Sequence, residues 1–432
     1  MPGRTPRAAL VTIVVGLAVA TLAGCRGEDR PEVVNVPRDA KTIRAAIEAA
    51  HPGDLVLVQP GVYREEVEID KPRITLRGID RNEVVIDGEF TRPNGVVVTG
   101  EGSAVQNLTV RNALLNGVVV RSEGEGGQTA GGGYGALDPP PDRPLRGFLV
   151  DHVTAYNNGL YGIYAFNARQ GTIQSSYASG MADAGIYVGR CKPCDVVVRG
   201  NVAERNAVGY EAVNASGPLY VYGNRFTGNR VGVTTNSHRL EAFVPQEDAH
   251  ITGNVIGANN QELAPAQAEG GFGIGLGIAG GTRNTVARNL VVANRTAGVV
   301  LASEGDLAPV GNRVIGNAFT ANGVDVVYAT TPAAPGSGNC LEGNALASVL
   351  PPSLPTTCQG SVGAPSGVPL PATAAPPGIA SRDVQPPPPL RNLPDAATAP
   401  PPTTSGLPGP VDLSAVGVPE ADLLADQSTI RW

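Results

Sequence analysis

The stretch that decides the fold runs from Gly185 to Thr235, and it contains one pattern twice. It reads GIYVGRCKPCDVVVRGNVAERN (185–206), AVGYEAVNASGPLYVYGNRFTGN (207–229) and RVGVTT (230–235). Each copy opens with a Gly and alternating apolar residues, passes through a turn and a short apolar run, and ends with two Asn residues. A repeat of this length, built from period-two apolar runs, predicts one coil of a parallel β-helix.

The same pattern extends over most of the chain. Leucine-rich repeats need fixed leucines that are missing here, and an immunoglobulin-like sandwich would show more hairpin turns. We therefore predict an all-β fold over residues 33–345, a single-stranded right-handed parallel β-helix of about a dozen coils. The glycines that open strands are Gly95, Gly117, Gly162, Gly185, Gly209, Gly232, Gly298 and Gly323, and the Asn pairs are Asn107/Asn112, Asn201/Asn206, Asn224/Asn229, Asn254/Asn259, Asn289/Asn294 and Asn317/Asn322.

Recurring Asn has a physical use in such a fold. Its short side chain tolerates the left-handed conformation of a turn and can hydrogen-bond the same Asn one coil away. Composition agrees, since the chain has 56 Gly and only 16% charged and 4% aromatic residues, as tight turns and small stacked side chains require.

Residues 1–24 predict an export signal, with a basic start ahead of the apolar segment 8–23. They end in Leu22-Ala23-Gly24-Cys25, which resembles the lipobox of bacterial lipoproteins. The resemblance implies cleavage before Cys25 and lipidation of its thiol, so that residues 25–32 would tether the protein outside the cytoplasm to the bacterial cell membrane. The alternatives are an ordinary secretory signal or a membrane anchor, although 16 apolar residues are short for a span.

The β-helix is flanked by a helix and a tail. Residues 39–50 predict a helix, because Ile43, Ala46, Ile47 and Ala50 share one face, and this helix should cap the first coil. Residues 346–432 are rich in Pro and Ala, so we expect a largely disordered or polyproline II tail. An insertion at 122–146 interrupts the coils and fits either a functional loop or a disordered excursion.

Cysteine usage fits an exported protein. Once Cys25 is lipidated, four cysteines are left to pair in an oxidising compartment. We predict the disulfides Cys191–Cys194 and Cys340–Cys358. The first pair also fits a redox motif or half of a zinc site, but no second CxxC accompanies it and the four His are scattered. The sequence identifies no metal site and no cofactor, and a Ca²⁺ ion, though compatible with the chain, has no support in it.

Three motifs resemble the amino-terminal start of the pectate-lyase-like β-helix superfamily. They are Pro52-Gly53-Asp54, Pro60-Gly61-Val62-Tyr63-Arg64-Glu65 and Ile74-Thr75-Leu76-Arg77-Gly78. Pectin methylesterases and many bacterial right-handed β-helix repeat proteins share this start. The resemblance covers residue 33 to about residue 344; it implies the fold but not an activity.

Charge and motifs exclude several functions. A net charge of −7 argues against nucleic-acid binding. The Walker loop, GxSxG elbow and HExxH motif are missing, as are the catalytic signatures of the superfamily. Val150-Asp151-His152-Val153 is similar to the Asp-His segment of pectate lyases, yet it falls where other coils have Gly200-Asn201, so we interpret it as a turn.

One column of side chains stands out as a candidate surface. Aligning the coils on their glycines puts Tyr210 inward and turns Tyr164, Tyr187, Glu211 and Thr234 outward. Coils repeat at roughly 4.8 Å, close to one sugar unit, and Tyr and Arg suit sugar rings and uronate carboxylates. We assign polysaccharide binding to Tyr164, Asn167, Tyr187, Asn214, Thr234 and Arg239, and acid–base chemistry, if present, to Glu211, Arg190 and His238.

Three functions stay open. The protein is a cell-envelope lipoprotein, expected to be a monomer, that binds extracellular or cell-wall polysaccharide along this column. Alternatively it is a uronate lyase or epimerase, if Glu211, Arg190 and His238 converge. The third reading is a non-catalytic envelope protein that presents its Pro-rich tail to a protein partner.

Overall fold

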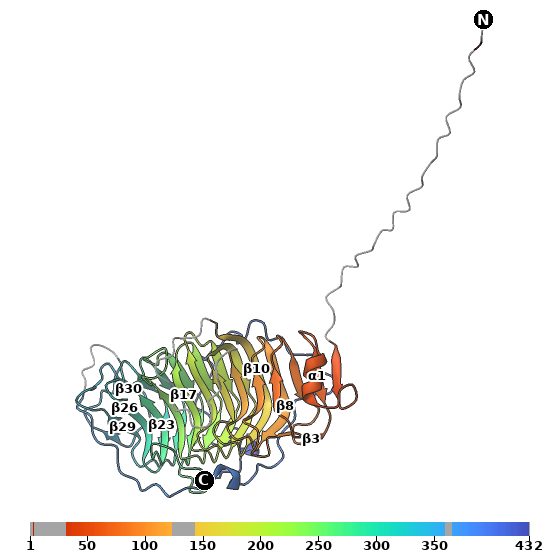
Figure 1. Ribbon diagram of the computed structural model, residues 1–432. Coiled ribbons are helices and arrows are strands. Elements are labelled where there is room, and N and C mark those ends of the chain that lie inside the picture. The colour runs from red at the N-terminus through yellow and green to blue at the C-terminus, as the bar shows by residue number, and fades with distance from the viewer. Residues whose placement is uncertain (1–2, 4–31, 123–142, 359–364, 432) are drawn as a thin grey trace. The chain divides into compact units, whose positions relative to one another are not determined.

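The computed structural model describes residues 3, 32–122, 143–358 and 365–431. The export signal, Cys25 and most of the insertion predicted at 122–146 lie outside these described residues. From Glu32 onward the chain forms one unit, built from parallel strands that stack coil upon coil (Figure 1). No helix within the described residues is long and apolar enough to cross a membrane.

Each coil contributes strands to two parallel sheets. The 11-stranded sheet, called sheet B, takes one strand per coil. Its strands are β4 (Val67–Ile69), β7 (Asn94–Val98), β9 (Asn116–Arg121), β11 (Ile163–Phe166), β14 (Ala184–Cys191), β17 (Val208–Ala215), β20 (Val231–Asn236), β23 (Ile274–Ala279), β26 (Ala297–Ala302), β29 (Val326–Ala329) and β31 (Val349–Leu350).

The 20-stranded sheet, called sheet A, has two faces that meet at a bend. The long strands β8 (Ser103–Arg111) and β10 (Leu145–Tyr156) run through both faces and join them. The first face also holds β1 (Val33–Val36), β2 (Leu55–Val58), β5 (Thr75–Gly78), β12 (Ala168–Gln174), β15 (Val196–Arg199), β18 (Leu219–Tyr222), β21 (Ala249–Thr252), β24 (Thr285–Ala287), β27 (Arg313–Ile315) and β30 (Cys340–Glu342). The second face holds β3 (Gly61–Tyr63), β6 (Val84–Asp87), β13 (Tyr177–Ser179), β16 (Val202–Glu204), β19 (Arg225–Thr227), β22 (Val255–Gly257), β25 (Leu290–Val292) and β28 (Ala318–Thr320).

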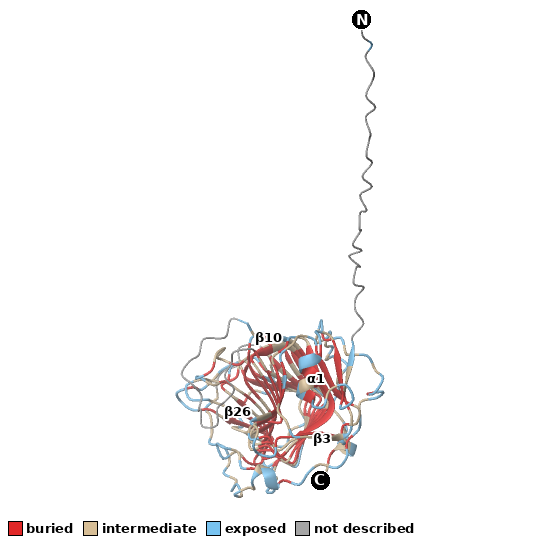
Figure 2. Cartoon of the chain, turned by 45° about the vertical axis from the view of Figure 1, so that its right-hand side comes forward, coloured by how far each residue is buried: buried red, intermediate tan, exposed pale blue. Residues whose placement is uncertain are grey.

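One continuous apolar core fills the space between the sheets, from Val36 at one end to Leu354 at the other (Figure 2). The described strands thus begin at the predicted residue and continue to Leu350, five residues beyond the predicted limit of 345. Both predicted disulfides, Cys191–Cys194 and Cys340–Cys358, are present, with Cα–Cα distances of 4.7 and 5.2 Å.

The predicted capping helix is α1 (Ile43–Ala49), shorter than the predicted range. Ile43, Ala46 and Ile47 are buried against the first coils, as their shared face predicts. The Thr42 hydroxyl accepts from Ala45 N at 3.1 Å, and the Lys71 ammonium donates to carbonyls of the last turn, which fits the polarity of a helix.

Buried Asn ladders connect successive coils at two turns, the bend in sheet A and the turn from the second face of sheet A to sheet B. The Nδ2 of Asn201 donates to Asn224 Oδ1 at 3.0 Å, and the Nδ2 of Asn224 donates to Asn254 Oδ1 at 2.9 Å. The same arrangement continues through Asn289, Asn317 and Asn344, and a second ladder joins Asn206, Asn229, Asn259, Asn294 and Asn322. The predicted coil-to-coil Asn bonds are therefore confirmed.

In these coils the residue before each ladder Asn, and not the Asn itself, adopts the left-handed backbone conformation. Gly200, Arg205, Gly223 and Gly228 have φ of 57 to 64°, whereas the ladder Asn residues that follow them do not have positive φ. Asn107 and Asn112 of an early coil do adopt it. His152 takes the same turn position, with φ of 53°, and its Nδ1 lies 2.7 Å from Asp151 Oδ1. Its interpretation as a turn residue is confirmed.

A column of glycines lets adjacent coils approach on sheet B. A Cβ on Gly162, Gly209 or Gly232 would lie 2.5 to 2.6 Å from the carbonyl oxygen of the next glycine in the column. That column includes Gly275, which the sequence pattern missed. Gly323 does not belong to it, because a Cβ there would meet Arg295 O at 2.1 Å and the nearest strand begins only at Val326.

The tail follows a defined path over the coils, where composition predicts either disorder or an extended polyproline II segment. Residues 365–431 are mostly extended, with two single-turn 3₁₀ helices, η1 (Ser381–Asp383) and η2 (Ala425–Gln427). Figure 1 shows this segment in blue, running back beside the strands. Composition could not reveal this path, because the groups that hold the tail lie on the coils.

Buried arginines of the coils bind the tail through its backbone. Arg77, Arg81, Arg225 and Arg230 are at most 2% exposed. They donate to tail carbonyl oxygens: Arg77 to Ala399 at 2.6 Å, Arg81 to Arg391 at 3.2 Å, Arg225 to Ala421 at 2.9 Å and Arg230 to Pro376 at 2.6 Å. Proline leaves the carbonyl oxygens of an extended chain without helix or sheet partners, and guanidinium groups satisfy them.

The end of the tail is held by a buried carboxylate. Glu204 is 0% exposed and accepts from Tyr177 Oη at 2.9 Å, Ser428 Oγ at 2.5 Å and Thr429 N at 3.1 Å. The Arg391–Asp426 ion pair, at 2.7 Å, joins two parts of the tail that are far apart in sequence. The tail is thus part of the folded unit.

The glycine column predicts a position-dependent cost of adding a methyl group. Gly209→Ala should lower the free energy of unfolding by about 1–3 kcal/mol, because its Cβ overlaps a backbone oxygen. Gly277→Ala, on β23, has nothing within 4 Å of its Cβ and should be neutral or stabilising by about 0.4–1 kcal/mol. Urea unfolding of both variants checks this, and equal effects would contradict the close-approach argument.

The buried arginines predict that tail contacts contribute to stability. Arg81 binds Thr154 Oγ1 and Val153 O as well as the tail, so Arg81→Ala should lower the free energy of unfolding by about 3 kcal/mol. Arg146→Ala, at an exposed arginine of β10, is the control and should stay within about 0.5 kcal/mol of the parent. Limited proteolysis should cut the tail faster only in Arg81→Ala; an equally protected tail would contradict the prediction.

Candidate functional site

The predicted column exists in the predicted register. On sheet B, Tyr164 of β11 pairs with Tyr187 of β14, Tyr187 pairs with Glu211 of β17, and Glu211 pairs with Thr234 of β20. All four side chains belong to the face turned away from the core, whereas Tyr210 is 0% exposed and packs on Phe226 inside it. The inward and outward assignments of the sequence are therefore confirmed.

The tyrosines of this column are buried, contrary to the prediction of an open binding surface. Tyr164 and Tyr187 are 7% and 2% exposed, and Tyr161, just before β11, is 3% exposed. Their ring centroids lie 4.7 to 5.0 Å apart, which makes a packed aromatic cluster. The period-two pattern predicts the direction in which a side chain points but not how exposed it is, because the pattern does not show how neighbouring rings cover one another.

Two predicted sugar-binding amides have structural partners. Asn167 is 2% exposed and its Nδ2 donates to Ser122 Oγ at 2.7 Å. Asn214 is 0% exposed; its Nδ2 donates to His238 O at 2.7 Å and its Oδ1 accepts from His238 N at 2.9 Å. Both adopt positive φ at the end of a strand, so they close turns, and their amides are engaged within the coils.

The remaining predicted residues are only partly brought together. Arg239 is exposed and forms an ion pair with Asp306. Arg190 is 8% exposed, with its guanidinium carbon 5.5 Å from the Phe166 ring centroid. Burial and the carboxyl groups of Asp183, Glu269 and Glu241 raise the pKa of Glu211. The convergence of Glu211, Arg190 and His238 stays a prediction.

The chemical centre of this face is a pair of carboxyl groups, Asp183 and Glu211, which hydrogen-bond each other. Both are partly exposed, beside the tyrosine cluster. Burial raises the pKa of Glu211 well above its ordinary value, and the neighbouring charge of Asp183 raises it further. Burial also raises the pKa of Asp183, although a hydrogen bond from Tyr161 favours its charged form. Glu211 is thus the partner that holds the proton.

Sequence reasoning missed Asp183 and Tyr161. Both lie in turns just before a strand, and the pleat of a strand gives no direction for turn residues. The one available signal was an acidic residue two positions before a strand-opening glycine, Gly185. Two carboxyl groups with pKa values raised by burial and by each other are typical of acid–base sites.

The described residues hold no group of three or more His, Cys, Asp or Glu that could bind a metal ion. The site contains a proton donor, Glu211, and a carboxylate, Asp183. The hydroxyl of Tyr161 donates a hydrogen bond to that carboxylate. The two carboxyl groups would act as one unit that shares a proton.

The pair predicts an unusual pH dependence of stability. A carboxyl group whose pKa is raised in the folded state stabilises the fold fully below its ordinary pKa near 4.5, and that contribution is lost as the pH rises through the raised value. Glu211→Gln removes the charge and keeps a donor for Asp183. Relative to this variant, the parent protein should therefore lose stability as the pH rises above about 4.5.

Urea midpoints measured across this pH range check the prediction. Glu68→Gln is the matched control, because Glu68 is an exposed carboxylate in the same outward column of sheet B, and it should follow the parent protein. Parallel curves for the parent protein and Glu211→Gln would show that the two carboxyl groups do not share a proton.

Comparisons with known proteins bear on the fold. A family profile described as "Right handed beta helix region" matches residues 94–256. The A-module of mannuronan C-5 epimerase AlgE4 from Azotobacter vinelandii is similar in structure, with a TM-score of 0.50 and 16% identity over 73% of this chain and 94% of that one. The A-module of AlgE6 from the same organism gives a TM-score of 0.51 and 17% identity over 71% and 89%.

A search of curated protein sequences gives no significant match. The profile nevertheless covers the central coils, including the column from Tyr164 to Thr234, and the two structural similarities cover most of the chain. The chain thus has the right-handed parallel β-helix fold that its sequence predicts.

Proposed function

We propose that this protein acts on a polysaccharide at the outer face of sheet B, with Asp183 and Glu211 as the acid–base pair. The observation that carries the proposal is the partly exposed carboxyl pair with raised pKa values, set in a rigid aromatic cluster. Preorganised groups of this kind are costly to maintain and typical of sites that transfer protons.

The β-helix supports an extended substrate. Thr234 and Glu211 lie on adjacent coils in the same column, and the half-buried Phe166 lies two coils before Glu211. Parallel strands repeat at roughly 4.8 Å, so a sugar chain laid across them meets an equivalent position on each coil. The names of the two similar structures, mannuronan C-5 epimerases, also support a sugar polymer as the substrate.

Charge favours an uncharged sugar at this face. Glu241 and Glu269 both raise the pKa of Glu211, so the pair sits in an acidic environment. A uronate carboxylate would be repelled there unless a cation neutralised it. We therefore favour cleavage of a neutral chain, in which Glu211 gives its proton to the glycosidic oxygen as the C–O bond breaks, and the proton of the attacking water returns to the pair.

A uronate lyase or epimerase is the second candidate. It is favoured by Arg190, whose guanidinium lies on the same outer side of sheet B, over Phe166, and could pair with a uronate carboxylate. A binder without catalysis is the remaining alternative, and it would need Glu211 only as a hydrogen-bond donor.

We also propose that the protein is exported and lipid-anchored through Cys25. The disulfides Cys191–Cys194 and Cys340–Cys358 support an oxidising compartment, since such bonds rarely persist in the cytosol.

The test is a panel of neutral and acidic polysaccharides incubated with the mature protein. New reducing ends alone indicate hydrolysis, ultraviolet absorbance indicates an unsaturated lyase product, and proton NMR detects epimers. Glu211→Gln should lower turnover about a hundredfold or more, the usual contribution of a general acid, with little change in polysaccharide affinity.

Glu68→Gln, on the same outward column, is again the control and should keep full turnover. If a polysaccharide binds and is left unchanged, the protein is a binder. If turnover survives in Glu211→Gln, the pair is not the catalytic centre. If no polysaccharide binds or reacts, the proposed function is wrong.

A further inference from the structure

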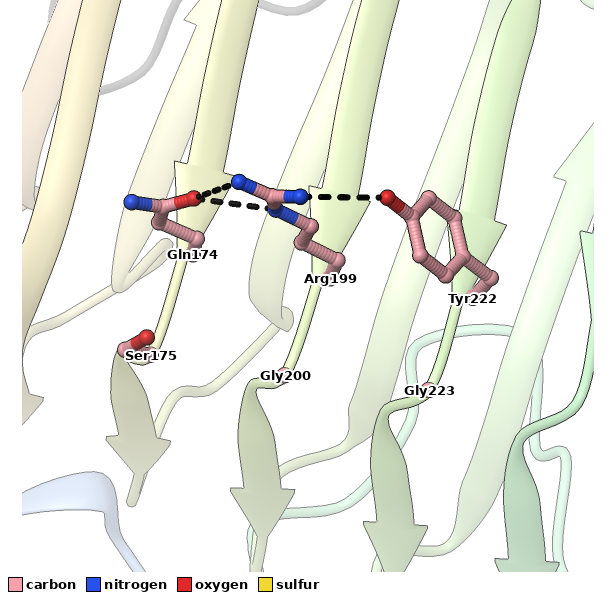
Figure 3. A pocket seen from close by; sticks show the side chains of 6 residues that line it. All are labelled: Gln174, Ser175, Arg199, Gly200, Tyr222 and Gly223. Carbon is pink, nitrogen blue, oxygen red and sulfur yellow. Dashed lines mark hydrogen bonds between the residues drawn. The ribbon is translucent and has the colours of Figure 1, made fainter. Parts of the chain in front are cut away.

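A second polar group lies on the first face of sheet A, away from the carboxyl pair. Gln174 of β12, Arg199 of β15 and Tyr222 of β18 are in register on three successive coils. Arg199 donates to Gln174 Oε1 through Nε at 3.0 Å and Nη2 at 2.7 Å, and its Nη1 lies 3.3 Å from Tyr222 Oη. Figure 3 shows the guanidinium between its two neighbours, which hold it in one orientation.

The charge of Arg199 is not compensated. Its side chain is exposed, and it forms no ion pair with any residue that the structure describes. By contrast, the guanidinium of Arg283, in the segment just before β24, binds both Glu247 and Asp248. A guanidinium has five N–H donors, and the three bonds of Arg199 leave one on each terminal nitrogen for an external acceptor.

Space for such an acceptor is present next to it. A hollow is lined by Gln174, Ser175, Arg199, Gly200, Tyr222 and Gly223. Gly200 and Gly223 form its turns with φ of 64°, and a Cβ at Gly223 would meet nothing within 4 Å. The side-chain amide nitrogen of Gln174 and the half-buried ring of Tyr222 border the same space.

The tail contacts the same column of turns on either side of this hollow. Towards the amino-terminal coils, Leu393 N donates to Asn107 Oδ1 at 2.7 Å. Towards the carboxyl-terminal coils, Val416 covers Gly253, where an added Cβ would lie 2.2 Å from its side chain. Along this column of turns the two contacts lie on either side of the hollow, while other parts of its coils, at Glu204 and Arg225, also bind the tail.

We propose that this hollow binds an oxyanion group, a carboxylate or a sulfate, carried on a sugar chain. The two open N–H groups of Arg199 fit two oxygens of such a group side by side. The Gln174 amide can donate to a sugar oxygen, and the Tyr222 ring offers an apolar face to sugar C–H groups. The site goes beyond the proposed function, because it lies on another sheet and selects negative charge, which the acidic face of sheet B repels.

Titration calorimetry of the mature full-length protein at low salt tests the proposal. The probes are polygalacturonate as the carboxylate polymer, dextran sulfate as the sulfate polymer, and dextran as the neutral control. At least one acidic polymer should bind and dextran should not; the comparison of the two acidic polymers identifies which oxyanion the site takes. Arg199→Ala should weaken binding at least tenfold, and Arg199→Lys should restore it only in part, since an ammonium lacks the paired donors.

Arg313→Ala is the matched control, because Arg313 is exposed on β27 of the same face, four coils away. It should bind the acidic polymer like the parent protein. Glu211→Gln should do the same, which separates a failure of the proposed catalytic function on sheet B from a failure of the proposed oxyanion site on sheet A. An equal loss in Arg313→Ala would show diffuse attraction and overturn the proposal. So would unchanged binding by Arg199→Ala, absence of binding to either acidic polymer, or equally tight binding of poly-L-glutamate, which would make the partner an acidic peptide.

Discussion

The structure depends on the hydrogen bonds that each buried Asn makes to the coil after it. An Asn such as Asn224 is 0% exposed, and its amide bonds the next ladder residue, Asn254, on one side while accepting from Asn201 on the other. A buried amide without such partners would cost roughly 1–3 kcal/mol. Because the partner must lie one coil away at the same position, the ladder fixes the register between coils. The register of every outward-facing column of side chains, on either sheet, is therefore set by the ladder.

Two surfaces of opposite chemistry follow from this register. On sheet B, the Asp183–Glu211 pair lies among further carboxylates and packed tyrosines. On sheet A, Arg199 lies between Gln174 and Tyr222 with its charge uncompensated. Each group takes its members from neighbouring coils or the turns beside them, so neither could form if the coils slipped by one residue, since a slip would turn every side chain to the other face.

Much of the fold could be predicted from the sequence, because glycine and asparagine recur for reasons that are local. Gly162 is required by the carbonyl oxygen of the next coil, and Asn201 by the amide of the next ladder residue. The alternation of strands then placed Glu211 outward correctly. The pattern could not show that Tyr187 is covered, that Asn214 closes a turn, or that Asp183 reaches Glu211 from outside a strand. These features depend on side-chain packing and on turn geometry, and neither produces a periodic pattern in the sequence.

The tail changes how the coil stack can come apart. In a repeat protein whose coils touch only their neighbours, the ends can fray while the middle stays folded, and stability is a sum of local terms. Here one segment bonds Arg77 near the first coils, Arg225 in the middle and Arg288 further along, through carbonyls of Ala399, Ala421 and Leu413. Opening an end coil therefore also disturbs contacts made many coils away. Such long-range coupling turns a one-dimensional array into a single cooperative unit, in which partial unfolding from either end is suppressed.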